Sequence, residues 1–172
     1  MTTIQTDRPI YERPVLLRHE MGLMNKFGRT QAMQPLTHID GVAVDELVEQ
    51  YGSPLFVFSE RVLVDRIREM REAFSRRWPD VRLAWSYKTN YLDAICRIFH
   101  REGAWGEVVS EFEYDKALRN GVPADRVHFN GPHKTEPVLD RALSADTLVH
   151  IDHFDELAAA ESVAERRGIR PK

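Results

Sequence analysis

Two hydrophobic periods alternate along the last two thirds of the chain. Short apolar runs predict buried strands at residues 81–87, 105–109, 126–130 and 147–151. Between them, apolar residues recur every three or four positions, which predicts helices beginning near residues 59, 90, 110, 135 and 152. An apolar run with aromatic residues predicts one more short strand at residues 54–59. The strand starts recur at nearly even spacing, as in a chain of repeated strand–helix units.

Strands that alternate with helices across short loops indicate a parallel sheet with right-handed crossovers. An open doubly wound sheet has the same alternation, but its glycine-rich first turn is missing, because residues 87–90 are Tyr-Lys-Thr-Asn. The pattern therefore favours part of a barrel. A complete (β/α)₈ barrel usually takes about 250 residues. Since the chain has 172, we expect about four βα units.

The N-terminal part has a different pattern. Residues 1–40 contain three prolines and short apolar patches without helical periodicity, which predicts an extended, partly ordered arm. Residues 45–51 predict a short helix closed by Gly52, a residue suited to the position after a helix end. We therefore divide the chain into an arm with a short helix, residues 1–48, and an α/β barrel domain, residues 49–172.

Composition narrows the class of protein. Hydrophobic residues make up 42% and charged residues 30%, which permits a packed core. No apolar run approaches the length of a membrane span, and 24 basic against 27 acidic residues give no pull toward nucleic acid or an anionic membrane. The single cysteine, Cys96, excludes an internal disulfide and falls on an apolar helix face, so we expect it to pack in the core. With no secretory signal in residues 1–13, a cytoplasmic location is expected.

Chemistry in parallel α/β folds gathers at the carboxyl ends of strands, and Lys88 follows the first barrel strand. Beside apolar walls, the pKa of a lysine can fall and leave a nucleophilic amine. Such an amine can form a Schiff base with an aldehyde such as pyridoxal 5'-phosphate (PLP). The simpler alternative is a lysine that extends into solvent.

Two acidic residues near the next strand are further candidates. Glu107 lies within that strand, where its carboxylate could orient the Lys88 amine or a cofactor ring; the alternative is a solvated carboxylate. Ser110 and Glu113 have the spacing of a capping box, so a structural role competes with a functional one for both.

The remaining polar residues at strand ends give weaker signals. His150 and His153 flank Asp152, but their spacing does not aim two rings at one point, so no metal site is expected. His133 and Lys134 could meet an anion, although we expect both on the surface. On the arginine-rich helix after residue 59, basic and acidic residues four apart predict ion pairs, Arg61 with Asp65 and Arg68 with Glu72.

Five segments together resemble a known family. They are residues 51–58 (Tyr-Gly-Ser-Pro-Leu-Phe-Val-Phe), 85–90 (Trp-Ser-Tyr-Lys-Thr-Asn), 106–113 (Gly-Glu-Val-Val-Ser-Glu-Phe-Glu), 127–135 (Val-His-Phe-Asn-Gly-Pro-His-Lys-Thr) and 151–157 (Ile-Asp-His-Phe-Asp-Glu-Leu). In order and spacing they are similar to the fold-type-III PLP-dependent group-IV decarboxylases, which act on ornithine, arginine or diaminopimelate. The resemblance extends from about residue 40 to residue 168.

The resemblance implies a PLP-dependent amino-acid decarboxylase of the diaminopimelate type. Lys88 would form the internal aldimine with PLP, and Glu107 and Glu113 would lie in the cofactor-binding site. The implied fold is an alanine racemase-like (β/α)₈ barrel followed by a β-domain, active as a homodimer. This chain would hold the N-terminal half of that barrel and, alone, would be inactive. Four residues depart from those usual in the family, which leaves the substrate open: Trp85 replaces tyrosine or phenylalanine, Ser86 and Thr89 replace alanine, and Glu107 replaces aspartate.

Two other classes of protein stay open. One is another fold-III PLP protein, an amino-acid racemase or a PLP carrier, against which the predicted strand before the first helix argues. The other is a non-catalytic α/β interaction module, in which the motifs would be coincidence. Retention of Lys88 argues against a homologue that has lost catalysis.

Overall fold

A computed structural model describes residues 24–25, 28–29 and 36–171 of the chain. It divides into two compact units, residues 1–52 and 53–172. Most of the predicted N-terminal arm lies outside the described residues. No described helix is long and apolar enough to cross a membrane.

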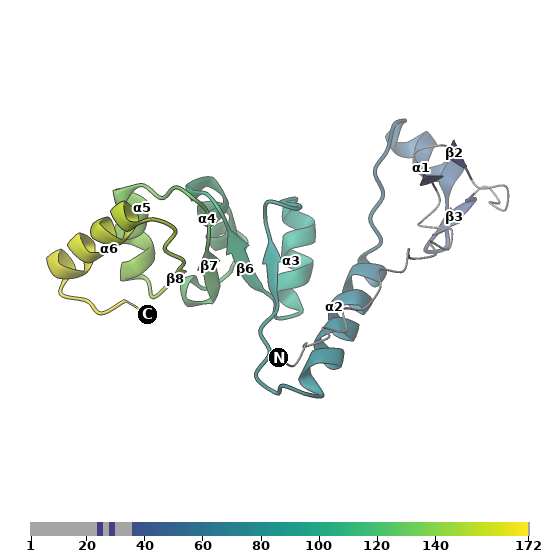
Figure 1. Ribbon diagram of the computed structural model, residues 1–172. Helices are drawn as coiled ribbons and strands as arrows, with labels where there is room; N and C mark the ends of the chain where they lie inside the picture. The colour runs from purple at the N-terminus through teal and green to yellow at the C-terminus, as the bar shows by residue number, and fades with distance from the viewer. Residues whose placement is uncertain (1–23, 26–27, 30–35, 172) are drawn as a thin grey trace, which may run out of the picture. The chain divides into compact units, whose positions relative to one another are not determined.

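Among its described residues, the first unit contains two short antiparallel strand pairs and one helix (Figure 1). Strand β1 (Met24–Asn25) pairs with β2 (Gly28–Arg29), and β3 (His38–Ile39) pairs with β4 (Val42–Ala43). Asp40 and Gly41 join the second pair with φ angles of 49° and 83°, a left-handed turn that these two residue types favour. Helix α1 (Val44–Tyr51) ends at Gly52, as its sequence predicts.

The second unit consists of a parallel sheet and its helices (Figure 1). In chain order its elements are α2 (Glu60–Ser75), β5 (Ala84–Ser86), α3 (Asp93–Arg101), β6 (Trp105–Val108), α4 (Glu111–Arg119), the 3₁₀ turn η1 (Ala124–Arg126), β7 (Val127–Phe129), α5 (Glu136–Ser144), β8 (Leu148–Val149) and α6 (Phe154–Arg167). The strands are parallel in the order β5-β6-β7-β8. Strands that follow one another in space as in sequence form a barrel wall, whereas the order of a doubly wound sheet reverses at a switch point.

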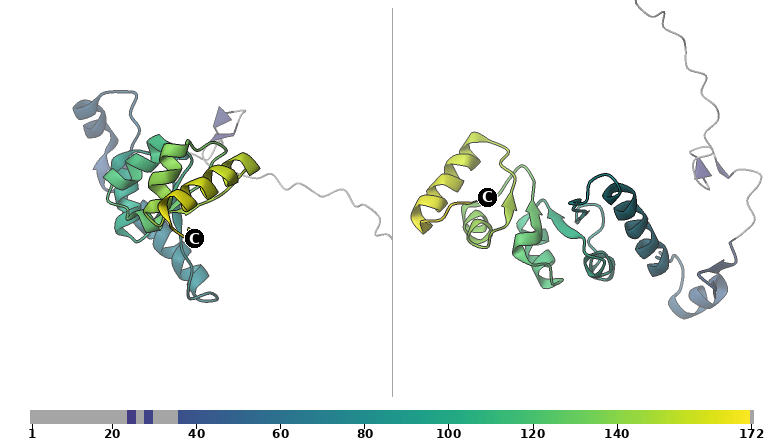
Figure 2. Two further views of the ribbon diagram at one scale, coloured as in Figure 1. Left: turned by 90° about the vertical axis from the view of Figure 1, so that its left-hand side faces the viewer. Right: turned by 90° about the horizontal axis from the view of Figure 1, so that it is seen from below.

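One face of this sheet is buried and the other is not. Helices cover the face that carries Val108, Val127 and Phe129, all of them fully buried (Figure 2). The residues between them in sequence, Glu107 and His128, point to the opposite face and are half-buried. This alternation follows from the two-residue period of a strand. Cys96 is buried in the core, as predicted.

Several helix starts match the predicted caps, and others shift by a residue or more. Ser59 accepts a hydrogen bond from the Val62 N–H, and Ser110 accepts one from the Glu113 N–H. The predicted caps at Asn90 and Asp152 differ, because α3 begins after Leu92 and α6 after His153.

Two further expectations differ from the structure. Residues 54–59 pair with no described strand, and Phe56 is 88% exposed, because an apolar run forms a strand only beside a partner. The predicted pair of Arg68 with Glu72 is wrong, since Arg68 instead binds Glu102, the residue that follows α3, through two bonds of 2.7 and 2.9 Å. The pair of Arg61 with Asp65 is confirmed at 3.3 Å.

Candidate functional site

The carboxyl edge of the sheet brings Lys88 next to Glu107. Ser86, Glu107 and His128 are register partners on β5, β6 and β7, so their side chains form one row on the uncovered face. Lys88 follows Ser86 by two residues at the end of β5. Its Nζ lies 3.9 Å from Glu107 Oε1. The two site residues that the sequence predicts on neighbouring strands are therefore in contact.

Lys88 is more exposed than its sequence predicts. Its side chain is 57% exposed, whereas that of Glu107 is 18% exposed. The expectation that apolar walls desolvate the amine is wrong for this structure, because β5 ends before Lys88 and leaves it at the open edge of the sheet.

Glu107 is held by more than Lys88. The Ser86 hydroxyl donates a hydrogen bond to Glu107 Oε2, and the Asn130 side-chain amide donates one of 3.4 Å to Oε1. A carboxylate with three neighbouring donors is not the free, solvated group that the alternative required. Ser86 is absent from the candidates that sequence analysis gives. Its place on the predicted strand 81–87, beside the strand that carries Glu107, was the available signal, because register partners on neighbouring strands point to the same face.

Glu113 has contacts of a different kind. It is 8% exposed, and its Oε2 accepts a 2.9 Å hydrogen bond from the Val109 N–H. Its own N–H donates to Ser110, so the two residues close the start of α4 in the manner of a capping box. None of these contacts involves Lys88 or Glu107. A cofactor-binding role for Glu113 stays a prediction, and its visible role is to fix the loop after β6.

Lys134 is buried, which contradicts its expected surface position. Its side chain is 0% exposed, and Nζ lies 2.9 Å from Glu156 Oε1 and 2.8 Å from each of the carbonyl oxygens of Gly131 and His150. Gly131 has a φ of 113°, and a Cβ there would press against the Val109 carbonyl. Lys134 therefore ties together the loops after β7 and β8. His133 is exposed, as predicted.

The histidines of the uncovered face do not form a metal site. Within the described part of the chain, no group of three or more His, Cys, Asp and Glu side chains is arranged to hold a metal ion. The rings of His128 and His150 lie 5.7 Å apart. Burial, with a smaller effect from His150, lowers the pKa of His128. His153 Nε2 lies 2.9 Å from Asp152 and 3.0 Å from the Pro132 carbonyl.

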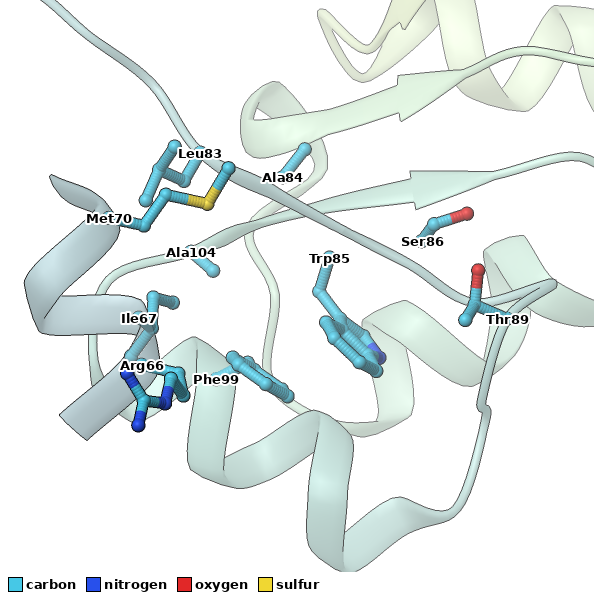
Figure 3. A pocket seen from close by; sticks show the side chains of 10 residues that line it. All are labelled: Arg66, Ile67, Met70, Leu83, Ala84, Trp85, Ser86, Thr89, Phe99 and Ala104. Carbon is cyan, nitrogen blue, oxygen red and sulfur yellow. The ribbon is translucent and has the colours of Figure 1, made fainter. Parts of the chain in front are cut away.

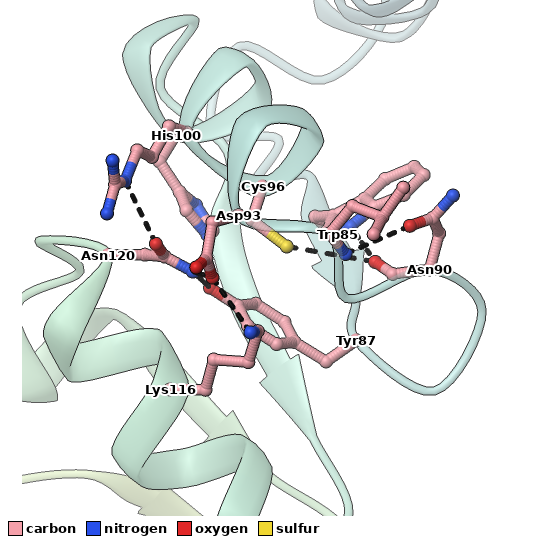
Figure 4. A network of polar contacts seen from close by, with 10 residues as sticks. Trp85, Tyr87, Asn90, Asp93, Cys96, His100, Lys116 and Asn120 are labelled. Carbon is pink, nitrogen blue, oxygen red and sulfur yellow. Dashed lines mark hydrogen bonds and ion pairs between the residues drawn. The ribbon is translucent and has the colours of Figure 1, made fainter. Parts of the chain in front are cut away.

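A partly buried polar network fixes Tyr87, the residue before Lys88 (Figure 4). His100 Nδ1 is 2.9 Å from the Ala104 carbonyl, which can only accept, so Nδ1 carries a proton and Nε2 accepts from the Tyr87 hydroxyl at 2.9 Å. The Asn120 amide donates to the same hydroxyl. Burial lowers the pKa of His100 and raises that of Tyr87, so both stay neutral. The backbone that carries Lys88 is thereby anchored on the helix side of the sheet.

An apolar cavity of about 380 Å³ lies beside the free edge of β5 (Figure 3). Ile67 and Met70 of α2 line it together with Trp85 and Phe99, whose rings stack at 3.9 Å. Ser86 and Thr89, which lie on either side of Lys88 in the sequence, also line it. Because the lining is mainly apolar, the cavity has few groups that could recognise a polar ligand.

Comparison with known proteins gives one family. The family described as "Pyridoxal-dependent decarboxylase, pyridoxal binding domain" matches residues 62–170. Diaminopimelate decarboxylase of Aquifex aeolicus is 29% identical over 131 residues, covering 76% of this chain and 30% of the relative. The enzyme of that name from Methanocaldococcus jannaschii is 32% identical over 136 residues, covering 76% and 31%.

Solved structures agree with the sequence comparison. The crystal structure of M. jannaschii diaminopimelate decarboxylase in co-complex with L-lysine has a TM-score of 0.68 at 32% identity, covering 76% of this chain and 31% of that one. These neighbours are TIM-barrel decarboxylases, so the expected fold class is confirmed. The chain spans about 30% of the length of the relatives that it matches.

Proposed function

This chain belongs to the family of pyridoxal-dependent decarboxylases, through their pyridoxal binding domain, and on that premise we propose that it forms part of a PLP-dependent amino-acid decarboxylase in which Lys88 binds the cofactor. The observation that carries the proposal is the placement of the Lys88 amine beside the Glu107 carboxylate, at the carboxyl edge of a parallel sheet. This is the edge at which α/β barrels carry their chemistry.

The side chains at this edge fit part of a PLP site. The accessible amine of Lys88 can bind the cofactor's aldehyde covalently, and Glu107 is close enough to orient either the amine or the cofactor ring. Bound PLP supplies an electron sink for the pair left on Cα when the carboxylate departs as CO₂. Glu113 acts on this site through the loop it fixes between β6 and α4.

A diamino acid is the proposed substrate class. The relatives from A. aeolicus and M. jannaschii are diaminopimelate decarboxylases, and one structure of the M. jannaschii enzyme contains L-lysine. A distal amino group distinguishes such substrates from most other amino acids. The departures at Ser86 and Glu107 lie at the edge that carries Lys88, so the choice among diamino acids is part of the test.

Two statements about the whole protein belong to the same proposal. The first is that it works as a homodimer in the cytoplasm, without nucleic acid or membrane. The second is that the 172-residue chain has no turnover by itself. Support for the second is the length of the chain, about 30% of that of its relatives, together with one sheet face that no described element covers.

The test is CO₂ release from diaminopimelate, lysine, ornithine and arginine by the longest polypeptide that carries this sequence. Lys88→Arg keeps the charge but cannot bind an aldehyde as lysine does, so we expect turnover to fall by at least about a hundredfold. Lys116→Arg is the matched control, because Lys116 pairs with Asp93 rather than Glu107. It should keep wild-type turnover.

Three results would count against the proposal. Equal activity in the two arginine variants would remove Lys88 from the reaction. Racemisation without CO₂ release would favour the racemase alternative. PLP-dependent CO₂ release by the 172-residue chain alone would contradict its expected inactivity.

A further inference from the structure

We propose that Ser86 and Asn130 are positioning residues that hold the Glu107 carboxylate beside Lys88. For its role in the reaction this inference rests on the proposed function, but the contacts themselves do not involve the cofactor. Neither residue touches Lys88 in a contact that the structure records. Both would act on it only through Glu107.

The contacts span three adjacent strands. Ser86 at the end of β5 donates to Glu107 Oε2, and Asn130, just after β7, donates to Oε1. Lys88 approaches Oε1, the oxygen that Asn130 also contacts. The two donors thus hold the carboxylate from the two strands beside β6, and the Lys88 ammonium lies next to one of its oxygens, Oε1.

These two hydrogen bonds are needed because packing alone fixes neither Lys88 nor Glu107. The Lys88 side chain is 57% exposed, and a glutamate has one more rotatable bond than an aspartate. An exposed ion pair contributes little when both side chains are free to move, because ordering them costs conformational entropy. Hydrogen bonds from two strands restrict the rotation of the Glu107 carboxylate, so that less entropy is lost when Lys88 pairs with it.

The amino-acid choices at these positions match one another. Ser86 and Glu107 are both departures from the residues usual in the resembling family, alanine and aspartate, and in this structure they contact each other. Alanine could not donate this hydrogen bond. The longer carboxylate and the hydroxyl therefore act as a pair, and a change at Ser86 should matter only while the Glu107 carboxylate is present.

The test measures how readily the Lys88 amine reacts at each pH in the cofactor-free protein. Trace acetylation with acetic anhydride, read by peptide mass spectrometry, gives the fraction of unprotonated amine, and Lys116 in the same sample is the internal reference. The Glu107 carboxylate is the ion-pair partner that the structure records for this amine. We therefore expect Glu107→Gln, which removes that partner, to raise the acetylation rate of Lys88 about threefold relative to Lys116.

Ser86→Ala should shift the Lys88 profile in the same direction by a smaller amount, because an unheld carboxylate spends less time beside the ammonium. Asn130→Ala should do the same, and more weakly, since its bond is the long one at 3.4 Å. Ser86→Thr keeps the hydroxyl and should restore the wild-type profile. In the Glu107→Gln background, Ser86→Ala should add nothing. Thermal unfolding of each variant controls for folding.

The inference is overturned if Ser86→Ala leaves the Lys88 profile unchanged, shifts it the opposite way, or shifts it equally with and without the Glu107 carboxylate. Ser86→Thr behaving like alanine would also overturn it. Because no cofactor is present, the outcome is separate from that of the proposed function. A protein that shows the coupling but never binds PLP would retain the positioning residues and lose the decarboxylase proposal.

Discussion

Lys134 is a charged residue that is buried together with its hydrogen-bond acceptors. Its ammonium has three acceptors within 2.9 Å, two of them backbone carbonyls and the third the Glu156 carboxylate. The other oxygen of Glu156 accepts from the Asp152 N–H at 2.9 Å. Removing one member would therefore leave the other buried without its counter-charge.

We expect Lys134→Ala to lower the free energy of unfolding by about 3–5 kcal/mol, the usual result of stranding a buried charge. Urea unfolding measures this. The control is Arg141→Ala, which removes a half-exposed partner of Asp115 and should cost about 1 kcal/mol or less. Equal losses in the two variants would contradict the account of Lys134 as a buried tie between loops.

At this scale, sequence analysis predicts which residues meet when they lie on neighbouring strands, as Lys88 and Glu107 do. It fails for Lys134, because the partner Glu156 is 22 residues away and the pair forms only after α5 and α6 pack together. It also overstates the burial of Lys88, since strand β5 ends earlier than its apolar run suggests.

At the scale of elements, glutamates at the starts of two helices fix the loops that follow the strands. Glu113 and Glu156 each occupy the third position of a helix, after β6 and after β8, and each accepts from the N–H just before the cap residue. The two carboxylates thus satisfy the backbone donor of the loop residue that precedes each cap. These hydrogen bonds fix the backbone of the loops after β6 and β8, at the edge of the sheet that carries the site residues.

Glu113 can be tested as a cap against its implied role as a cofactor residue. Glu113→Gln keeps an acceptor for the Val109 N–H and should unfold much like the wild type, whereas Glu113→Ala should lose about 1–2 kcal/mol. Urea unfolding and the absorbance of bound PLP are measured on the same samples. Weakened PLP binding in Glu113→Gln at unchanged stability would return Glu113 to the cofactor site.

Element types were predictable because the two periods of apolar residues are distinct, and all four barrel strands and their helices are present. The first and last residues of the elements were less predictable than their types. The first barrel strand covers three residues of the expected seven, and α6 begins after His153 because Glu156, not Asp152, supplies the side-chain oxygen at its start. Competing caps within a few residues differ too little for sequence alone to separate them.

On the scale of the whole molecule, the described second unit is one wall of a barrel. Its strands follow sequence order, and β5 and β8 each pair with only one described strand. One face is packed under helices and the other carries Glu107 and His128. The length of the chain and the absence of a glycine-rich turn were enough to predict this wall, whereas the elements that complete it are beyond what these residues specify.

The central claim is that Lys88 is the residue that binds PLP, and reductive trapping tests it most directly. The longest polypeptide that carries this sequence is incubated with PLP, reduced with borohydride, digested and mapped by mass spectrometry. We predict one phosphopyridoxyl group on Lys88, lost in Lys88→Arg and retained in Lys116→Arg. A modification confined to another lysine, or none at all, would contradict the claim.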